Sequence, residues 1–171
     1  MSRAMVVFES TFGNTEEVAH AVADGLRSRM DVDVVAVGAA PAAPPDDVDL
    51  LVVGGPTHAF GLTRAVTRED AVRQAGHALI SRGAGLREWL EDLRPRDGLP
   101  VVAFDTKVNR PHLPGSAAHG ADPRLRRLGA RTIVRPESFW VSGTRGPLLE
   151  GETERARAWG TWVAAALETS R

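Results

Sequence analysis

The chain of 171 residues contains no cysteine and no tyrosine, and Lys107 is its only lysine. Without cysteine it forms no disulfide, no thiolate metal site and no thiol nucleophile, which excludes a cysteine-dependent phosphatase. Redox chemistry in such a chain needs a bound cofactor. The net charge is also small: the chain has 21 basic and 22 acidic residues, for a formal charge of -1. No overall field therefore favours nucleic acid or a membrane surface.

Long apolar runs are absent as well. No run approaches the roughly 20 residues that a membrane-spanning helix needs. The amino terminus enters an apolar strand pattern almost at once, without the basic stretch and apolar core of a signal peptide. We therefore expect a cytoplasmic protein.

Short apolar runs alternate with helical patterns along the chain. The length fits a single domain, residues 1–171. Alternation of this kind predicts an α/β fold with a parallel sheet and helices on both faces. The expected strands are Ala4–Phe8, Val32–Val37, Leu50–Val53, Leu99–Phe104 and a fifth strand divided between Thr132–Val134 and Ser138–Val141. The expected helices are Thr15–Arg29, part of Thr67–Ala78, Leu86–Leu93, Ala117–Leu128 and Glu152–Glu168.

The most informative segment is the turn from Glu9 to Thr15. It follows the apolar run Val6–Phe8 and precedes a segment with apolar residues at helical spacing. Free backbone N–H groups and the positive end of a helix dipole would point into this turn. Gly13 lets the backbone approach an anion closely. Hydroxyl donors come from Ser10, Thr11 and Thr15.

Two nucleotide-binding patterns are missing around this turn. The chain has neither the GxxxxGK[ST] pattern of nucleotide hydrolases nor the GxGxxG pattern of dinucleotide folds. A phosphate held by neutral donors alone suits a monophosphate that is not transferred. The alternative is an ordinary capping turn, in which Asn14 or Thr15 caps the helix ahead of two glutamates.

Two motifs resemble those of flavodoxins. The run Val6-Val7-Phe8-x-Ser10-x-x-Gly13-x-Thr15-x-x-x-Ala19-x-x-Val22 is similar to the loop in which that family holds the phosphate of flavin mononucleotide (FMN). The run Leu51-Val52-Val53-Gly54-Gly55-Pro56-Thr57-His58-Ala59-Phe60-Gly61 is similar to the family's second flavin loop. The resemblance implies a doubly wound, five-stranded parallel sheet of order 2-1-3-4-5. The loops after strands 1, 3 and 4 converge at the switch point of such a sheet.

The resemblance also implies FMN as the cofactor, with three groups of contacts. The phosphate would be held by Ser10, Thr11, Phe12, Gly13, Asn14 and Thr15. The ring would meet Pro56, Thr57, His58, Phe60 and Gly61, with Phe60 as the stacking aromatic. The pyrimidine edge would face Asp105, Thr106 and Lys107. Because the flavin carries the chemistry, we expect no catalytic side chain and no metal ligand.

The third loop departs from the family pattern. Flavodoxins usually supply a tyrosine or tryptophan here, whereas the segment from Asp105 to His112 has neither. His112 could replace it, or the ring face stays open to a substrate. A charge from Lys107 or Arg110 near the ring would stabilise the anionic reduced flavin. In the alternative, Lys107 is solvated or pairs with Asp105. Typical flavodoxins are also strongly acidic, and this chain is not.

Two further expectations concern packing. The segment Leu62–Gly85 is longer than a minimal crossover, so we expect a lid or a dimer contact there. Its side chains that could meet an anionic substrate or partner are Arg64, Arg68, Arg73 and His77, with Gly83 and Gly85 as a hinge. We expect Trp89, Trp140 and Trp159 in the core and Trp162 partly exposed.

Three functions fit these observations. We expect an FMN-binding redox protein, either an electron carrier or a small flavin-dependent reductase. It would be a monomer or homodimer that meets a redox partner or a small-molecule acceptor. The same scaffold could instead lack FMN and serve as a binding protein, or it could be a quinone or porphyrinogen oxidoreductase. A receiver domain is disfavoured, because the first strand ends Phe8-Glu9-Ser10 without an acidic pair.

Overall fold

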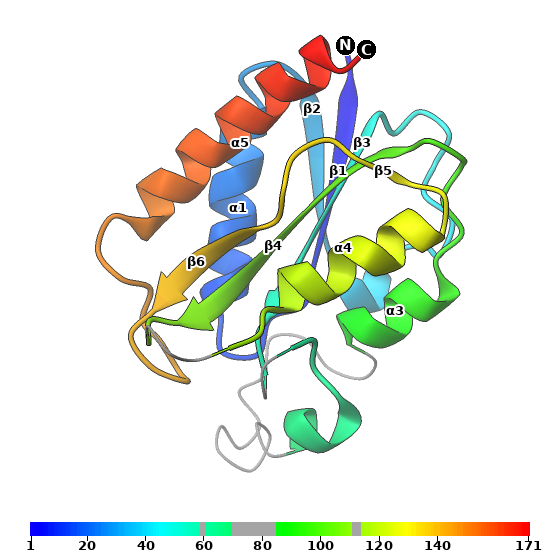
Figure 1. Cartoon of the computed structure of the whole chain (residues 1–171). Helices are drawn as coiled ribbons and strands as arrows, with labels where there is room; N and C mark the ends of the chain where they lie inside the picture. Colours follow the sequence, from blue (N-terminus) through cyan, green and yellow to red (C-terminus); the bar gives the residue numbers. More distant parts are fainter. Residues whose placement is uncertain (59–60, 70–84, 111–113) are drawn as a thin grey trace.

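The computed structural model describes residues 1–58, 61–69, 85–110 and 114–171. Its centre is a parallel sheet whose path runs β2-β1-β3-β4-β5, with β6 pairing β4 off this path (Figure 1). This is the predicted order 2-1-3-4-5. The strands are β1 Arg3–Phe8, β2 Asp31–Ala36, β3 Leu50–Pro56, β4 Pro100–Val108, β5 Arg131–Thr132 and β6 Glu137–Val141.

The fifth strand is divided, as the sequence predicted. β5 pairs with the start of β4 and β6 pairs with its end, from Phe104↔Glu137 to Val108↔Val141. Pro136 lies between the two pieces and has no N–H to donate to a ladder. Pairing with β6 keeps β4 extended up to Val108, so the prediction that this strand ends at Phe104 was wrong. Asp105, Thr106 and Lys107 therefore lie within β4 and not in a loop.

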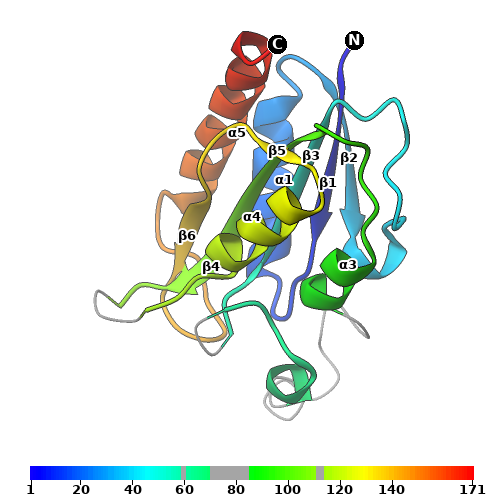
Figure 2. The ribbon, with the colours of Figure 1, turned by 45° about the vertical axis from the view of Figure 1, so that its right-hand side comes forward.

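Helices cover both faces of the sheet. α1 (Asn14–Leu26) and α5 (Glu152–Thr169) pack on one face, and α3 (Leu86–Asp92) and α4 (Ala117–Arg127) pack on the other (Figures 1 and 2). These four helices are close to the predicted ranges. A short 3-10 helix, Val37–Ala39, follows β2, and residues 65–69 are helical. Among the described residues, no helix has both the length and the apolar composition to cross a membrane.

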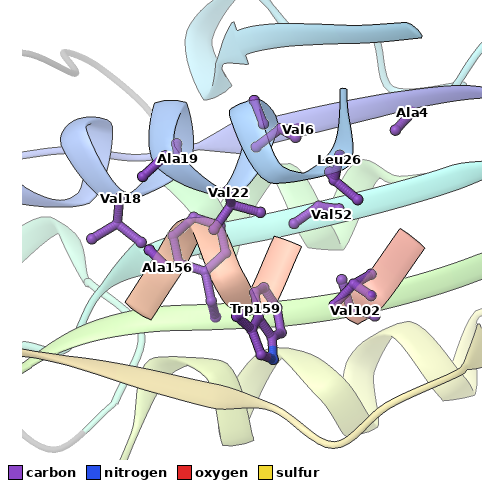
Figure 3. Packing of buried hydrophobic residues seen from close by; sticks show 14 of the residues in the cluster. Ala4, Val6, Val18, Ala19, Val22, Leu26, Val52, Val102, Ala156 and Trp159 are labelled. Atoms are coloured by element: carbon purple, nitrogen blue, oxygen red, sulfur yellow. The ribbon is translucent and has the colours of Figure 1, made fainter. Parts of the chain in front are cut away.

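The two faces of the sheet hold separate apolar cores, because side chains alternate along each strand. On β1, Val6 and Phe8 join the core under α1 and α5, while Val7 joins the core under α3 and α4. Figure 3 shows part of the first core, where α1, α5 and the sheet meet. α1 and α5 cross so closely that a Cβ on Gly25 would lie 2.1 Å from the Arg157 carbonyl oxygen.

The tryptophans divide between core and surface. Trp89 and Trp159 are buried, as predicted, and Trp159 packs edge-on against Phe104 and Phe139. Trp162 is 53% exposed, which also fits the prediction. Trp140 does not belong to either core. It is half-buried and lines a surface pocket beside β4, because its strand position faces α4 near the open edge of the sheet.

Candidate functional site

Four segments meet at the carboxyl edge of the sheet: the first loop (residues 9–13) after β1, the second loop after β3, of which residues 57, 58 and 61 are described, the end of β4, and residues 142–147 after β6. Hydrogen bonds join these segments. The Thr15 and Thr106 hydroxyls lie 2.8 Å apart, which joins α1 to β4. The Thr57 N–H donates to the Thr106 carbonyl at 2.9 Å. The edge predicted from topology is therefore one connected region.

The first loop leaves the amino end of α1 open. Four backbone N–H groups have no acceptor within the described part of the chain; they belong to Thr11, Phe12, Asn14 and Thr15. Gly13 has φ of 97°, a conformation that suits glycine, and a Cβ there would meet nothing within 4 Å. The loop thus presents unused donors and an uncluttered surface at the positive end of a 13-residue helix.

The capping turn with Asn14 or Thr15 as cap is not what the structure contains. The residue before α1 is Gly13, which offers no side chain. The Ser10 hydroxyl instead accepts from the N–H groups of Gly13 at 3.1 Å and Glu16 at 3.3 Å. Ser10 therefore shapes the loop. Thr15 is occupied by Thr106, so the Thr11 hydroxyl is the one in this loop without a partner among the described residues.

Residues 142–147 support the first loop, and sequence reasoning missed them. The Asn14 side-chain amide donates to the Arg145 carbonyl at 3.2 Å, and the Arg145 guanidinium lies 5.7 Å from the Phe12 ring centre. A Cβ on Gly146 would lie 2.4 Å from the Asn14 Oδ1 atom. The available signal was the Gly-and-Pro-containing turn after the fifth strand, which topology brings to the same edge.

The second loop is tied to its neighbours through backbone and hydroxyl groups. His58 and Gly61 exchange both backbone hydrogen bonds, at 2.8 and 3.0 Å. The Thr57 hydroxyl accepts from the Ala117 N–H at 3.0 Å, so it caps α4. Pro56 is the last residue of β3. Phe60, the predicted stacking residue, lies outside the described residues.

A buried polar network lies beneath the second loop. Glu9 is 2% exposed and accepts from the Thr63 hydroxyl at 2.7 Å and the Leu86 N–H at 2.7 Å. Burial raises the pKa of the Glu9 carboxyl. Burial, together with the Arg68 charge, lowers the pKa of His58 to about 4, so its imidazole is neutral at pH 7.

Arg68 joins this network because its guanidinium donates to the Thr63 hydroxyl at 3.0 Å, and it also forms an ion pair with Glu88. It is therefore not free to meet an anionic partner as predicted, whereas Arg64 is exposed. Arg73, His77 and Gly83 lie outside the described residues, as does much of the segment expected to form a lid or dimer contact. Glu9 itself had one sequence signal, a carboxylate placed directly after a buried strand.

The end of β4 faces both sides of the sheet. Thr106 points toward α1, while Asp105 and Lys107 face α4. Asp105 is fully buried and its Oδ2 accepts from the Ser116 hydroxyl and, at 3.0 Å, from the Ala118 N–H. Burial raises the pKa of Asp105. Its Oδ1 has no hydrogen-bond partner among the described residues. The predicted alternative of an Asp105–Lys107 ion pair is wrong, since the Asp105 carboxylate accepts hydrogen bonds from the start of α4.

Comparison with known proteins gives a consistent picture. The flavodoxin family model matches residues 6–81, which include both loop motifs. The chain has the flavodoxin-like fold. No curated protein matches it.

Solved structures share the flavodoxin-like fold over nearly the whole chain. Oxidised flavodoxin 1 from Bacillus cereus is 17% identical, with a TM-score of 0.67 and 98% of each chain covered. A flavodoxin from Streptococcus pneumoniae TIGR4 is 24% identical, with a TM-score of 0.66, covering 96% of this chain and 99% of that one. A flavodoxin, WrbA-like protein from Agrobacterium tumefaciens is 18% identical, with a TM-score of 0.60 and full coverage of both chains.

The first loop fits the phosphate of the FMN that the resemblance to flavodoxins implies. Its four unused N–H groups and the free Thr11 hydroxyl are hydrogen-bond donors, which is what phosphate oxygens require. The acidic side chains Glu16 and Glu17 lie on α1 beyond the loop. Among the described residues, no group of three or more His, Asp or Glu side chains could hold a metal ion.

Proposed function

We propose that this flavodoxin-like protein binds FMN and transfers electrons through it, as a carrier or a small reductase. The observation that carries the proposal is the open amino end of α1, with four backbone N–H groups that no described residue satisfies. Unused N–H groups at the positive end of a helix favour an anion, so a phosphate is a suitable acceptor for them. When bound, FMN would supply reversible redox chemistry.

In this proposal the first loop binds the phosphate in two ways. The N–H groups of Thr11, Phe12, Asn14 and Thr15 and the Thr11 hydroxyl donate to phosphate oxygens. Ser10 and Gly13 act indirectly, because Ser10 fixes the loop and Gly13 leaves its surface open. All of these donors are neutral, which suits a phosphate that is held and never transferred.

The second loop and the end of β4 would set the ring environment. Pro56, His58, Phe60 and Gly61 are the proposed ring contacts. A neutral His58 can donate or accept a hydrogen bond there, but it brings no positive charge at pH 7. Thr57, Asp105 and Thr106 act as braces, since their side chains hold α4 and α1 in place.

The choice between carrier and reductase depends on the partner. With a formal charge of -1, the protein lacks the overall negative field that would steer a strongly acidic flavodoxin toward basic partners. A small-molecule acceptor or a partner of moderate charge fits this surface better than a strongly basic protein.

The direct test is an absorbance spectrum of the purified protein, repeated after incubation with FMN and gel filtration. Retained flavin bands are the expected result, and riboflavin should be retained less well because it lacks the phosphate. Consumption of NADH or NADPH by the loaded protein with an added acceptor would then identify a reductase, while its absence would favour a carrier. Loss of all flavin on gel filtration, with no quenching of flavin fluorescence on titration, would refute FMN binding.

A further inference from the structure

A pocket of about 500 Å³ opens on the α4 side of the sheet, beside the end of β4. This volume lies within the range of small-molecule sites. Its lining includes Lys107, Ser116, His119, Glu137, Ser138 and Trp140. The first loop lies elsewhere, since Thr106 faces α1 while the next residue, Lys107, faces this pocket.

The sheet register brings an ammonium group and an indole together in the pocket. Lys107 on β4 pairs with Trp140 on β6, and paired residues of parallel strands point to the same face. Trp140 is half-buried, unlike the buried Trp89 and Trp159. Two hydrogen bonds fix the backbone of β6 at Trp140. The Trp140 backbone N–H donates to the Glu152 carboxylate at 2.7 Å, and the Leu149 N–H donates to the Trp140 carbonyl at 3.0 Å. The indole is therefore held on a fixed backbone.

The charge of Lys107 is not neutralised within the described part of the chain, where no carboxylate forms an ion pair with it. Glu137 is committed to Arg155 at 3.0 Å. Asp105, the nearest carboxyl along the strand, bonds to Ser116 and to the Ala118 N–H. His119 bonds through Nδ1 to Ser116 at 3.0 Å. The pocket thus offers one unpaired cation beside one aromatic surface.

We propose that this pocket binds a planar aromatic anion, with its ring against Trp140 and its anionic group on Lys107. Ring stacking and a charge-assisted hydrogen bond are the two contacts that these side chains supply. The site goes beyond FMN binding, because the phosphate donors of the first loop are separate residues. In this proposal Lys107 binds the second ligand and is not the contact with the pyrimidine edge of FMN that the resemblance implied.

Calorimetric titration with anthraquinone-2-sulfonate tests the proposal, on protein with and without FMN. We expect saturable binding in both forms. Lys107→Met keeps the aliphatic stem and removes the charge, so it should weaken binding at least about tenfold. Trp140→Leu should weaken it by a similar factor, and Trp140→Phe should retain most of it. Arg131→Gln removes an exposed charge outside the pocket and should change binding by less than about twofold.

Several outcomes would overturn the assignment. These are no binding at millimolar probe, equal affinity of wild type and Lys107→Met, or an equal loss in Arg131→Gln. Competition between probe and FMN would also overturn it, because the pocket would then be part of the flavin site. A protein that fails to retain FMN can still bind the probe, so the two proposals fail separately. Circular dichroism of each variant verifies that the fold is kept, and Trp140→Phe serves if Trp140→Leu does not fold.

Discussion

Two helices begin at the same edge of the sheet and treat their first N–H groups in opposite ways. At α4, the N–H groups of Ala117, Ala118 and His119 donate to the side chains of Thr57, Asp105 and Ser116, at 3.0, 3.0 and 3.2 Å. At α1, four N–H groups of the first loop and first turn have no acceptor among the described residues. Every helix start leaves such donors, so only their partners differ.

The difference shows which helix end is structural and which is available to a ligand. α4 is closed by the protein itself, at the cost of burying the Asp105 carboxyl, whose pKa is raised by that burial. α1 has a glycine and small hydroxyl residues where α4 has capping side chains. The first N–H groups of α1 are thus the ones we expect to bind an anion, whereas those of α4 already have side-chain acceptors.

The largest expected effect is on FMN affinity, and it comes from giving the first N–H groups of α1 a side-chain acceptor, as α4 has. Thr11→Asp places a carboxylate among the unused donors, where it repels the FMN phosphate. At a separation of about 5 Å this repulsion costs a few kcal/mol, so FMN affinity should fall more than about 100-fold. The stability of the FMN-free protein should stay within about 1 kcal/mol of wild type, because a carboxylate suits a helix start. Flavin fluorescence titration and urea unfolding measure the two quantities.

Two controls accompany this variant. Thr11→Val removes the hydroxyl without adding charge and should lose about tenfold in FMN affinity. Riboflavin should bind to wild type and Thr11→Asp equally, because it has no phosphate. An equal loss of riboflavin and FMN affinity would mean that the first loop does not hold the phosphate.

The next largest effect is on the unfolding free energy, and it comes from removing a side-chain acceptor at the start of α4. Asp105→Ala leaves the Ser116 hydroxyl and the Ala118 N–H without their acceptor in a buried place, which should cost about 2 kcal/mol of unfolding free energy. Asp105→Asn keeps an acceptor oxygen and should cost less than half as much. Urea unfolding of the FMN-free protein measures both. A stable Asp105→Ala protein would show that α4 does not need its cap.

The contrast also explains how far the sequence could predict this protein. The first loop was predictable, since glycine and hydroxyl residues directly between an apolar strand and a helix are a local pattern. The divided fifth strand was predictable from two short apolar runs around Pro136. The polar residues Asp105 and Thr106 read as a loop, because their burial comes from α4 and α1, which the local sequence does not contain.

The buried networks could not be predicted, because their members are distant in sequence. Glu9 meets Thr63 and Leu86, which are 54 and 77 positions away, and Asn14 meets Arg145 across 131 positions. Each residue alone reads as an ordinary polar loop residue. The half-buried position of Trp140 likewise depends on β6 lying at the edge of the sheet, which its apolar surroundings in the sequence do not reveal.

The second loop gives a third, smaller effect, through pH. The pKa of His58 is about 4 in the folded protein and 6.5 when unperturbed. As pH falls, His58 is therefore protonated in the unfolded chain before it is protonated in the folded protein. The stability that its neutral form contributes above pH 6.5 is lost as pH falls toward 4. Between pH 7 and pH 5 this loss is about 2 kcal/mol. Urea unfolding at both values should show it in wild type.

His58→Gln isolates this contribution, because the raised pKa values of Glu9 and Asp105 act in the opposite direction in both proteins. Carboxyls with raised pKa values stabilise the fold at low pH and lose that contribution as pH rises. The variant should lose about 2 kcal/mol less than wild type between pH 7 and pH 5. Identical pH profiles would show that His58 is not buried as a neutral imidazole.

The smallest expected effect tests whether the Thr15 hydroxyl donates to the phosphate or only holds α1 against β4. Thr15 and Thr106 share one hydroxyl hydrogen bond at 2.8 Å, and both are buried. Thr15→Val and Thr106→Val should each cost about 1 kcal/mol of unfolding free energy and lower FMN affinity by a similar small factor, because each breaks the same bond. The double variant should add little, since the second change removes nothing further. If Thr15→Val weakened FMN binding by tenfold or more while Thr106→Val did not, the Thr15 hydroxyl would be bonding the phosphate. The phosphate would then have two side-chain donors, Thr11 and Thr15, in place of one.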